Sequence, residues 1–348
     1  MPAAGRMVVM EWVGVAAFAL VGGLTEFVRR IAIRFALTDH PGVRKSHERP
    51  TPYLGGVVIV IGVLLPSVLV MSGGDGRLRT LILAAAAVAL LGLIDDLRPL
   101  NPPTRLIVEG LAATAVVVVD GRVHLFGNLL DYLLPVLWIV VITNSFNLLD
   151  NMDGAAAGVA AVTGAALSIS AFMVGQRSVG LLLLALACGC AGFLPHNWSP
   201  ARIFMGDAGS LFIGFVISAS ALFVCTGSGF EATVTGPLMV TFVATVDTCV
   251  VLVSRHRAGR PLMLGGTDHV SHRLRRLGLS TWQVASVLSA TAALTCLAVI
   301  PVVRGWVPAV IPLACVAGAG TLLVWLLQKV PVYTTHDEKS PQPTRIPL

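Results

Sequence analysis

Eleven apolar segments, each close to the length of a membrane-spanning helix, dominate this 348-residue chain. A helix needs roughly 20 apolar residues to cross the hydrocarbon core of a bilayer. Hydrophobic residues make up 55% of the chain and charged residues 12%, whereas soluble domains carry about 25% charged residues. The sequence therefore predicts an all-α, polytopic bundle of transmembrane helices with eleven spans, or ten, since several are short or Gly-rich. The predicted spans are 8–25, 54–72, 79–94, 105–120, 129–144, 155–174, 178–195, 208–226, 236–254, 281–302 and 306–327.

Basic residues are unevenly distributed among the loops between these segments. If the N-terminus lies outside, 18 of the 24 Lys and Arg residues fall on the inner side, which is the asymmetry expected of cytoplasmic loops. This orientation explains the net charge of +6 without nucleic acid, since no basic face is interleaved with aromatic residues. We expect one membrane-embedded domain over 1–330 and a disordered, cytoplasmic C-terminal tail over 331–348, which is rich in Pro and charge.

Five polar motifs interrupt the apolar pattern, and the same topology puts all of them on the cytoplasmic side. They read DHPGVRKSHERPTPYLGG at 39–56, DDLRPL at 95–100, NSFNLLDNMDG at 144–154, FMGDAGS at 204–210 and DHVSHRL at 268–274. The outer loops hold few carboxylates, and none of these is paired. We therefore expect a cytoplasmic active site built from the loops at 29–53, 95–104, 144–154, 196–207 and 255–280.

Three aspartates in these motifs have the chemistry of a metal site. Asp95 and Asp96 are adjacent, and two like charges repel unless a cation holds them. Asp207 lies between small residues at the start of a span, where a phosphate could approach backbone N–H groups. Oxygen ligands without Cys or His spacing favour Mg²⁺, or Mn²⁺ in its place. The alternatives are solvated loop charges for the pair and a helix cap for Asp207, but the joint pattern favours the metal.

A row of polar residues with a spacing of three ends the fifth predicted span. Asn144, Asn147, Asp150 and Asp153 lie on adjoining faces of a helix and can converge on one ligand. Taken singly, each could equally be a polar group at a helix end. Asp247 lies within the ninth predicted span, where a buried charge is costly, so it should face a partner or a cavity.

The motif at 268–274 contains two histidines beside several arginines. His269 and His272 are either ligands of an anionic substrate or residues of an interfacial basic loop, and the residues alone leave both interpretations open.

In order, spacing and membrane side, these motifs resemble the polyprenyl-phosphate N-acetylhexosamine-1-phosphate transferases of glycosyl transferase family 4, over about residues 38–280. The resemblance implies transfer of a sugar-1-phosphate from a UDP-N-acetylhexosamine to undecaprenyl or decaprenyl phosphate, with release of UMP and a requirement for Mg²⁺. It also implies a multi-pass protein of the cytoplasmic membrane that begins cell-envelope glycan synthesis on a lipid carrier. A homodimer is left open.

The resemblance also assigns the site residues by position. The aspartate pair and the M-G-D aspartate imply catalytic and metal-binding roles for Asp95, Asp96 and Asp207. The family's ninth-span aspartate matches Asp247. The substrate-binding residues implied are Lys45, His47, Thr51, Asn144, Asn147, Asp150, Asp153, Gly154, His269, His272 and Arg273.

The departures from the family pattern indicate which sugar-nucleotide branch of the family is closer. The usual H-x-H-H-R loop has one histidine fewer here, since Ser271 stands between His269 and His272. The H-H-H motif of the branch that transfers phospho-MurNAc-pentapeptide is absent as well, so the branch that uses UDP-GlcNAc is closer. The pentapeptide branch and a secondary transporter, whose acids normally sit near the bilayer midplane, are the alternative functions. Direct attack by the lipid phosphate is favoured because it asks less of the residues, and a covalent aspartyl-phosphate is the alternative.

Overall fold

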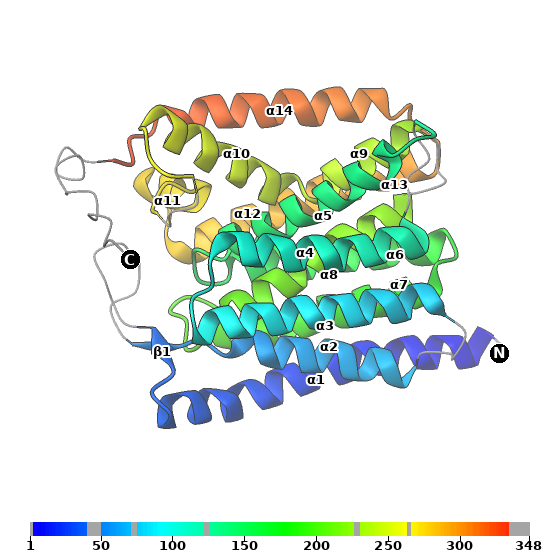
Figure 1. Ribbon diagram of the computed structural model, residues 1–348, viewed down its shortest axis with the longest axis horizontal. Helices are drawn as coiled ribbons and strands as arrows, with labels where there is room; N and C mark the ends of the chain where they lie inside the picture. Colours follow the sequence, from blue (N-terminus) through cyan, green and yellow to red (C-terminus); the bar gives the residue numbers. More distant parts are fainter. Residues whose placement is uncertain are drawn as a thin grey trace.

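The computed structural model describes residues 3–39, 50–70, 75–121, 126–225, 230–262 and 266–333, and its helices lie side by side along one direction (Figure 1). The elements are α1 (Ala3–Arg34), β1 (Thr38–Asp39), β2 (Thr51–Pro52), α2 (Gly55–Leu69), α3 (Gly76–Leu97), α4 (Pro102–Val116), the π-helical turn η1 (Val117–Gly121), α5 (Leu130–Leu149), α6 (Ala155–Met173), α7 (Arg177–Asn197), α8 (Gly206–Cys225), α9 (Phe230–Val240), α10 (Phe242–Arg257), α11 (Val270–Arg276), α12 (Thr281–Leu297), α13 (Val299–Val303) and α14 (Val310–Gln328). The short antiparallel pair β1–β2 is the single exception to the predicted all-α fold within the described residues.

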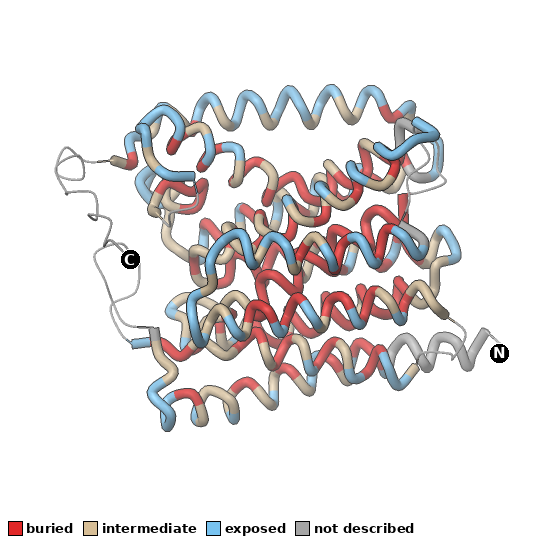
Figure 2. The backbone as a smooth tube through the Cα atoms, viewed as in Figure 1, coloured by how far each residue is buried: buried red, intermediate tan, exposed pale blue. Residues whose placement is uncertain are grey.

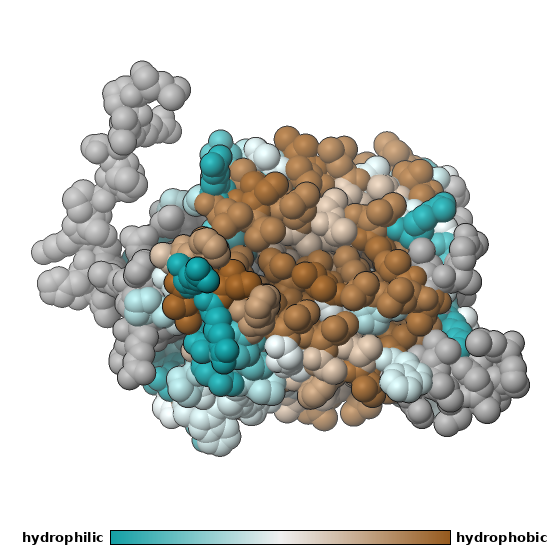
Figure 3. Space-filling model, turned by 90° about the horizontal axis from the view of Figure 1, so that it is seen from below, coloured by the Kyte–Doolittle hydropathy of each residue, from teal (hydrophilic) through white to brown (hydrophobic). Residues whose placement is uncertain are grey.

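The bundle has the dimensions and surface of a multi-pass membrane protein. In the described part of the chain, nine helices are long and apolar enough to cross a bilayer, α9 and α10 together form a bent candidate, and α2 is a shorter apolar helix. The outer helix α14 exposes nearly all of its side chains (Figure 2). Apolar side chains form a band across the middle of the molecule, with hydrophilic residues toward its two ends (Figure 3). Such a band suits contact with lipid, where helices satisfy their own backbone.

Two predicted spans differ from the helices observed. The ninth span, predicted as one helix, bends by 75° between α9 and α10. Pro237 lies in the last turns of α9, where it lacks an N–H and disturbs the preceding turn. The first span does not end at residue 25, because α1 continues to Arg34. Three of its charges form a network within the helix, since Arg29 and Arg30 donate to Glu26 at 2.9 and 3.1 Å.

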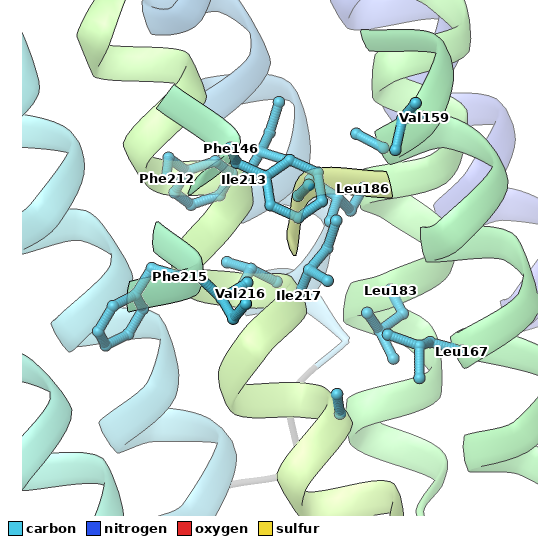
Figure 4. Close-up of a cluster of buried hydrophobic side chains, with 14 of the residues drawn as sticks. Phe146, Val159, Leu167, Leu183, Leu186, Phe212, Ile213, Phe215, Val216 and Ile217 are labelled. Atoms are coloured by element: carbon cyan, nitrogen blue, oxygen red, sulfur yellow. The ribbon is translucent and has the colours of Figure 1, made fainter. Parts of the chain in front are cut away.

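Helix α8 forms the centre of the bundle, and its described side chains between Ala208 and Cys225 are all buried. Phe212, Phe215 and Ile217 pack there with residues of α5, α6 and α7 (Figure 4). The start of α8 is approached closely by its neighbours. A Cβ at Gly56 of α2 would clash with the backbone of Gly209, and a Cβ at Gly92 of α3 with the carbonyl of Asp207. Glycines therefore allow α2 and α3 to fix the position of the M-G-D motif.

The described parts of the five polar motifs all lie at one end of the bundle, on the left in Figure 1. The chain returns to this end after α14. In residues 331–333, which the sequence assigned to the tail, the backbone carbonyls of Pro331 and Val332 accept hydrogen bonds from the Arg276 guanidinium of α11. The described residues end at Tyr333, and the rest of the predicted tail lies outside them.

Candidate active site

Arg105 connects three of the predicted polar motifs. It lies in the first turn of α4, and its Nη1 is 2.6 Å from Asp95 Oδ2 and 3.1 Å from Asp207 Oδ2. Its Nη2 donates to Asn147 Oδ1 at 3.3 Å. The planar, forked guanidinium is suited to holding several oxygens at once. Residues from α3, α5 and α8 therefore converge on one cation, which the sequence analysis had counted only as a loop charge.

The two adjacent aspartates have different environments. Asp95 accepts hydrogen bonds from Arg105 and from the Leu100 N–H at 2.5 Å. Asp96 instead accepts the first N–H groups of α8, from Asp207 at 2.8 Å and Ala208 at 3.0 Å. Such N–H groups lack partners within the helix, and a negative charge is favourable beside them. Asp96 is thus a cap of α8, and Asp95 faces the cluster.

This cap bears on where a phosphate could bind. The sequence suggested that a phosphate would approach the N–H groups at the start of α8, but Asp96 already binds two of them. Gly206 makes room for this contact: its φ is +73°, and a Cβ there would lie 2.7 Å from Asp96 Oδ2. Glycine tolerates this left-handed conformation at little cost.

The end of α5 supplies two amides to the cluster. Asn147 donates to Asp207 Oδ1 at 2.8 Å and to Ser210 Oγ at 3.0 Å. Asn144, one turn earlier, donates to Glu109 Oε2. Glu109 is fully buried in α4, and it escaped the sequence analysis although a lone carboxyl in an apolar segment is itself a signal. Two side-chain hydrogen bonds, Arg105–Asn147 and Asn144–Glu109, therefore join α4 to α5.

Asp150 caps the C-terminal end of α5, just beyond this span. Its carboxyl makes no hydrogen bond or ion pair with any other described residue. Burial raises the pKa of Asp150 well above its usual range, and the negative charges of Asp207 and Asp96 act in the same direction. Asp150 is therefore close enough to sense the carboxylate cluster, and an added cation would relieve the repulsion.

Asp153 and Gly154 form a turn that docks on the segment before α8. Asp153 Oδ2 accepts the Ala201 N–H, and Asn197 Oδ1 accepts the Gly154 N–H, both at 3.0 Å. Gly154 has φ +73°, which favours glycine. The observed contacts of these two residues shape the loop; their substrate roles stay predictions.

The PTPYLGG stretch docks on the same segment from another side. The Phe204 N–H donates to Pro52 O at 2.8 Å, and the Gly55 and Gly56 N–H groups donate to Phe204 O and Met205 O at 3.0 and 2.7 Å. Thr51 is buried in β2 beside this contact. This part of the N-terminal motif thus lies next to the M-G-D motif. Lys45 and His47 lie outside the described residues.

Asp247 of α10 has the partner that its burial required. Its Oδ2 lies 2.8 Å from His269 Nδ1, and its Oδ1 accepts the Val270 N–H at 2.7 Å. The His272 ring lies 6.2 Å from the His269 ring. Burial lowers the pKa of His272 to about 4, and charge on His269 acts in the same direction. His272 is therefore neutral near pH 7.

A hydrogen bond from Ser271 to Asn151 joins α11 to the loop that follows α5. Arg273, by contrast, is buried with its bonds directed into the chain: it donates to Leu327 O at 2.6 Å, to Val330 O at 2.7 Å and to Ser254 Oγ at 2.7 Å. Its substrate contact stays a prediction.

The donor set at Arg105 is suited to a divalent cation shared with substrate. Asp95 and Asp207 each direct one oxygen at the same point, the Arg105 Nη1 atom. Mg²⁺ commonly uses one or two carboxylates and takes its other ligands from water and substrate phosphates. Among the described residues, no group of three His, Cys, Asp or Glu side chains is placed to hold a metal alone. The residues thus fit a substrate-linked ion better than a closed cage.

Comparison with known proteins agrees with this arrangement. The family model described as Glycosyl transferase family 4 matches residues 78–225, which include Asp95, Asn147 and Asp207. The chain is 32% identical over 270 residues to a Bacillus subtilis strain 168 protein named probable undecaprenyl-phosphate N-acetylglucosaminyl 1-phosphate transferase, covering 74% of this chain and 75% of that one.

Two further relatives represent two substrate types. Identity is 32% over 312 residues to the decaprenyl-phosphate N-acetylglucosaminephosphotransferase of Mycolicibacterium smegmatis, covering 77% of this chain and 76% of that one. The chain is also 33% identical over 293 residues to the phospho-N-acetylmuramoyl-pentapeptide-transferase of Moorella thermoacetica. That alignment covers 76% of this chain and 90% of the other. With a cluster of carboxylates, amides and an arginine at one end of a membrane bundle, and with these relatives, the chain belongs to glycosyl transferase family 4.

Proposed function

We propose that this protein transfers N-acetylglucosamine-1-phosphate from UDP-GlcNAc to a polyprenyl phosphate and releases UMP. The observation that carries the proposal is the convergence of Asp95, Asp207 and Asn147 on Arg105 at the end of a transmembrane bundle. A water-soluble nucleotide and a membrane-bound phosphate can both reach such a position. Relatives named for transfer of N-acetylglucosamine phosphate to undecaprenyl and decaprenyl phosphate support the substrate class.

We propose that the site faces the cytoplasm, in the cytoplasmic membrane, with eleven spans and the N-terminus outside. The excess of Lys and Arg in the loops on the side of the polar motifs supports this orientation. The gathering of those motifs at one end of the bundle supports their placement on a single membrane side (Figure 1).

In the proposed reaction, an oxygen of the lipid phosphate attacks the β-phosphorus of the UDP-sugar. The bond from that phosphorus to the oxygen shared with the α-phosphate breaks, and UMP leaves with its electrons. Asp95 and Asp207 would hold Mg²⁺, which when bound neutralises the pyrophosphate. Asn147 keeps the Asp207 carboxylate oriented. Asp96 fixes the start of α8, and so the position of Asp207, without needing to touch substrate.

An apolar cavity offers space for the prenyl chain of the acceptor. It has a volume of about 370 Å³ and is lined by residues of α5, α8 and α9, among them Trp138, Val141, Leu222 and Leu238. Val141 precedes Asn147 by six residues on α5, which is about 9 Å of helix. Leu130 at the start of α5 and Leu222 near the end of α8 also line it, so the cavity lies mostly in the half of the bundle away from Arg105, and a prenyl chain would approach the cluster from its Val141 side.

The pentapeptide transferase is the second candidate, because one relative carries that name. The sequence His269-Val270-Ser271-His272 lacks the three consecutive histidines of that branch, which favours UDP-GlcNAc. A transporter is less consistent with the structure, since the deeply buried acids Glu109 and Asp247 have partners within the chain.

The test is a reaction of the purified protein in detergent with polyprenyl phosphate, Mg²⁺ and either UDP-GlcNAc or UDP-MurNAc-pentapeptide. We expect two products, UMP and a polyprenyl diphosphate that carries N-acetylglucosamine, and mass spectrometry would identify both. If only UDP-MurNAc-pentapeptide gives a product, the protein is a phospho-MurNAc-pentapeptide transferase instead. No UMP from either donor would contradict the proposal.

A further inference from the structure

We propose that residues 327–333, which we call the C-terminal strap, position the loop that carries His269 and His272 for binding of the nucleotide sugar. The inference rests on the proposed function for the nature of that ligand. Arg273 and Tyr333 are its positioning residues, and neither needs to touch substrate.

The strap is tied to α11 by arginine side chains. Arg273, which is 1% exposed, donates through one nitrogen to Leu327 O at 2.6 Å and to Val330 O at 2.7 Å. These carbonyls belong to the end of α14 and the turn after it. Carbonyls at a helix end lack partners within the helix, and a cation is favourable there. Arg276, one turn from His272, donates to the Pro331 and Val332 carbonyls.

Tyr333 ties the far end of the strap to the residue before His269. Its hydroxyl donates to Asp268 Oδ2 at 2.9 Å, and the Arg260 guanidinium lies 4.0 Å from the centre of its ring. Asp268 also forms a bidentate pair with Arg255 at 2.9 and 3.1 Å. Burial acts to raise the pKa of Asp268, but the hydrogen bonds and charge of Arg255 outweigh it, so the pKa lies below the usual range.

The backbone around His269 is thereby held from two sides. Asp247 binds the His269 ring and the Val270 N–H. Arg255, Tyr333 and Arg273 bind the side chain and carbonyl of Asp268. Charge-assisted hydrogen bonds of this kind are short and directional. The strap adds Tyr333 to this network and anchors Arg273, so it supports the backbone of Asp268 and His269 together with Asp247 and Arg255 of α10.

The weak packing of α14 makes this network important. Leu327, near its end, is the one buried side chain among the described residues of α14, so packing along the rest of the helix does little to hold it. Gln328 adds a further hydrogen bond, to Val250 O of α10 at 2.8 Å. Hydrogen bonds to α10 and α11 thus hold the strap in place.

The experiment compares the full-length wild-type protein with Tyr333→Phe and Arg276→Ala, using Arg275→Ala as the control. Arg275 is on the same helix, but it donates to Leu279 O and not to the strap. Amide hydrogen exchange over 266–276 reports the order of the loop. Steady-state kinetics report the KM for UDP-GlcNAc and for polyprenyl phosphate separately.

We expect faster exchange over 266–276 in both strap variants, and a roughly three- to tenfold rise in the KM for UDP-GlcNAc, as for loss of one hydrogen bond. In the strap variants, the KM for polyprenyl phosphate should equal that of wild type. In the control variant Arg275→Ala, both KM values and the exchange rates should equal those of wild type. In a His269→Gln, His272→Gln background, Tyr333→Phe should add little, because residues acting in one network are not additive.

Unchanged exchange and donor KM in both strap variants would overturn the proposal. Equal rises in both KM values, or an effect that simply adds to that of the histidine variants, would overturn it as well. If wild type releases no UMP, the proposed function fails. Faster exchange over 266–276 in the strap variants would still show that the C-terminal strap orders this loop.

Discussion

Asp96 occupies the start of α8, and its replacement by Asn distinguishes a capping role from a purely chemical one. Each carboxylate oxygen accepts one N–H, from Asp207 and from Ala208. Asn keeps one acceptor and turns an NH₂ group toward the other N–H. Loss of one hydrogen bond to a charged group costs about 1.5–3 kcal/mol, and loss of charge at a helix N-terminus costs about 0.3–1 kcal/mol. We therefore expect Asp96→Asn to lower the free energy of unfolding by about 2–4 kcal/mol.

The assay pairs denaturant unfolding in detergent with UMP release. Asp75→Asn is the matched control, because Asp75 caps α3 through the Leu78 N–H at 3.0 Å, at the opposite end of the bundle. Asp75 accepts a single N–H, for which Asn is as good a cap as Asp, so the control should lose at most the charge effect of about 0.3–1 kcal/mol and keep its activity. Asp96→Asn should lose both stability and activity, since α8 carries Asp207. Wild-type stability with abolished activity would refute the capping role and favour a direct chemical one.

Three further predictions concern charge, pH and topology. Arg105→Lys should lower turnover by roughly 10- to 100-fold, because a single ammonium cannot bridge three side chains as the guanidinium does; wild-type turnover would show that the bridge is dispensable. The pKa of His272 is about 4 in the folded protein against 6.5 for the free group, so the unfolded chain binds more protons below pH 6.5 and stability falls as the pH drops from 6.5 toward 4. The loss between pH 7.5 and 5.5 should be about 1.4 kcal/mol from this group, and it should vanish in His272→Gln when unfolding is measured at both values. A membrane-impermeant maleimide on intact cells should label a cysteine at Asn128 but not one at Arg98, and the reverse pattern would invert the proposed orientation.

The sequence predicted where the polar motifs lie better than how they contact one another. Apolar segments alternate across a membrane, so each motif can be placed at one end from span length and basic residues alone. Contacts between motifs depend on how α3, α5 and α8 are rotated and spaced. Adjacent residues on a helix point about 100° apart, so only one of Asp95 and Asp96 can face Arg105, and pattern alone does not say which. The close approaches of Gly56 and Gly92 to the start of α8 fix the positions of α2 and α3, and so determine which aspartate faces Arg105.

Two residues of the site were missed: Arg105 was counted only as one of the inner basic residues, and Glu109 fell within the predicted span 105–120. They are four residues apart on one face of α4, and their partners Asn147 and Asn144 are three apart on α5. A pair of charges at helical spacing in an apolar segment is the signal that would have found them. Arg273 was found from the family resemblance, but its bonds to Leu327 and Val330 depend on the tertiary packing of α14 against α11, which pattern alone does not give.

The most direct test of the proposed reaction centre is single-turnover release of UMP from UDP-GlcNAc by Asp207→Asn, in the presence of Mg²⁺ and polyprenyl phosphate. Asn preserves the side-chain volume and can still accept the Asn147 hydrogen bond, but it removes the charge beside Arg105. We expect at least a roughly 100-fold slower release with little loss of stability, as for removal of one group that stabilises transition-state charge. Release at the wild-type rate would contradict the assignment of Asp207 to the reaction centre.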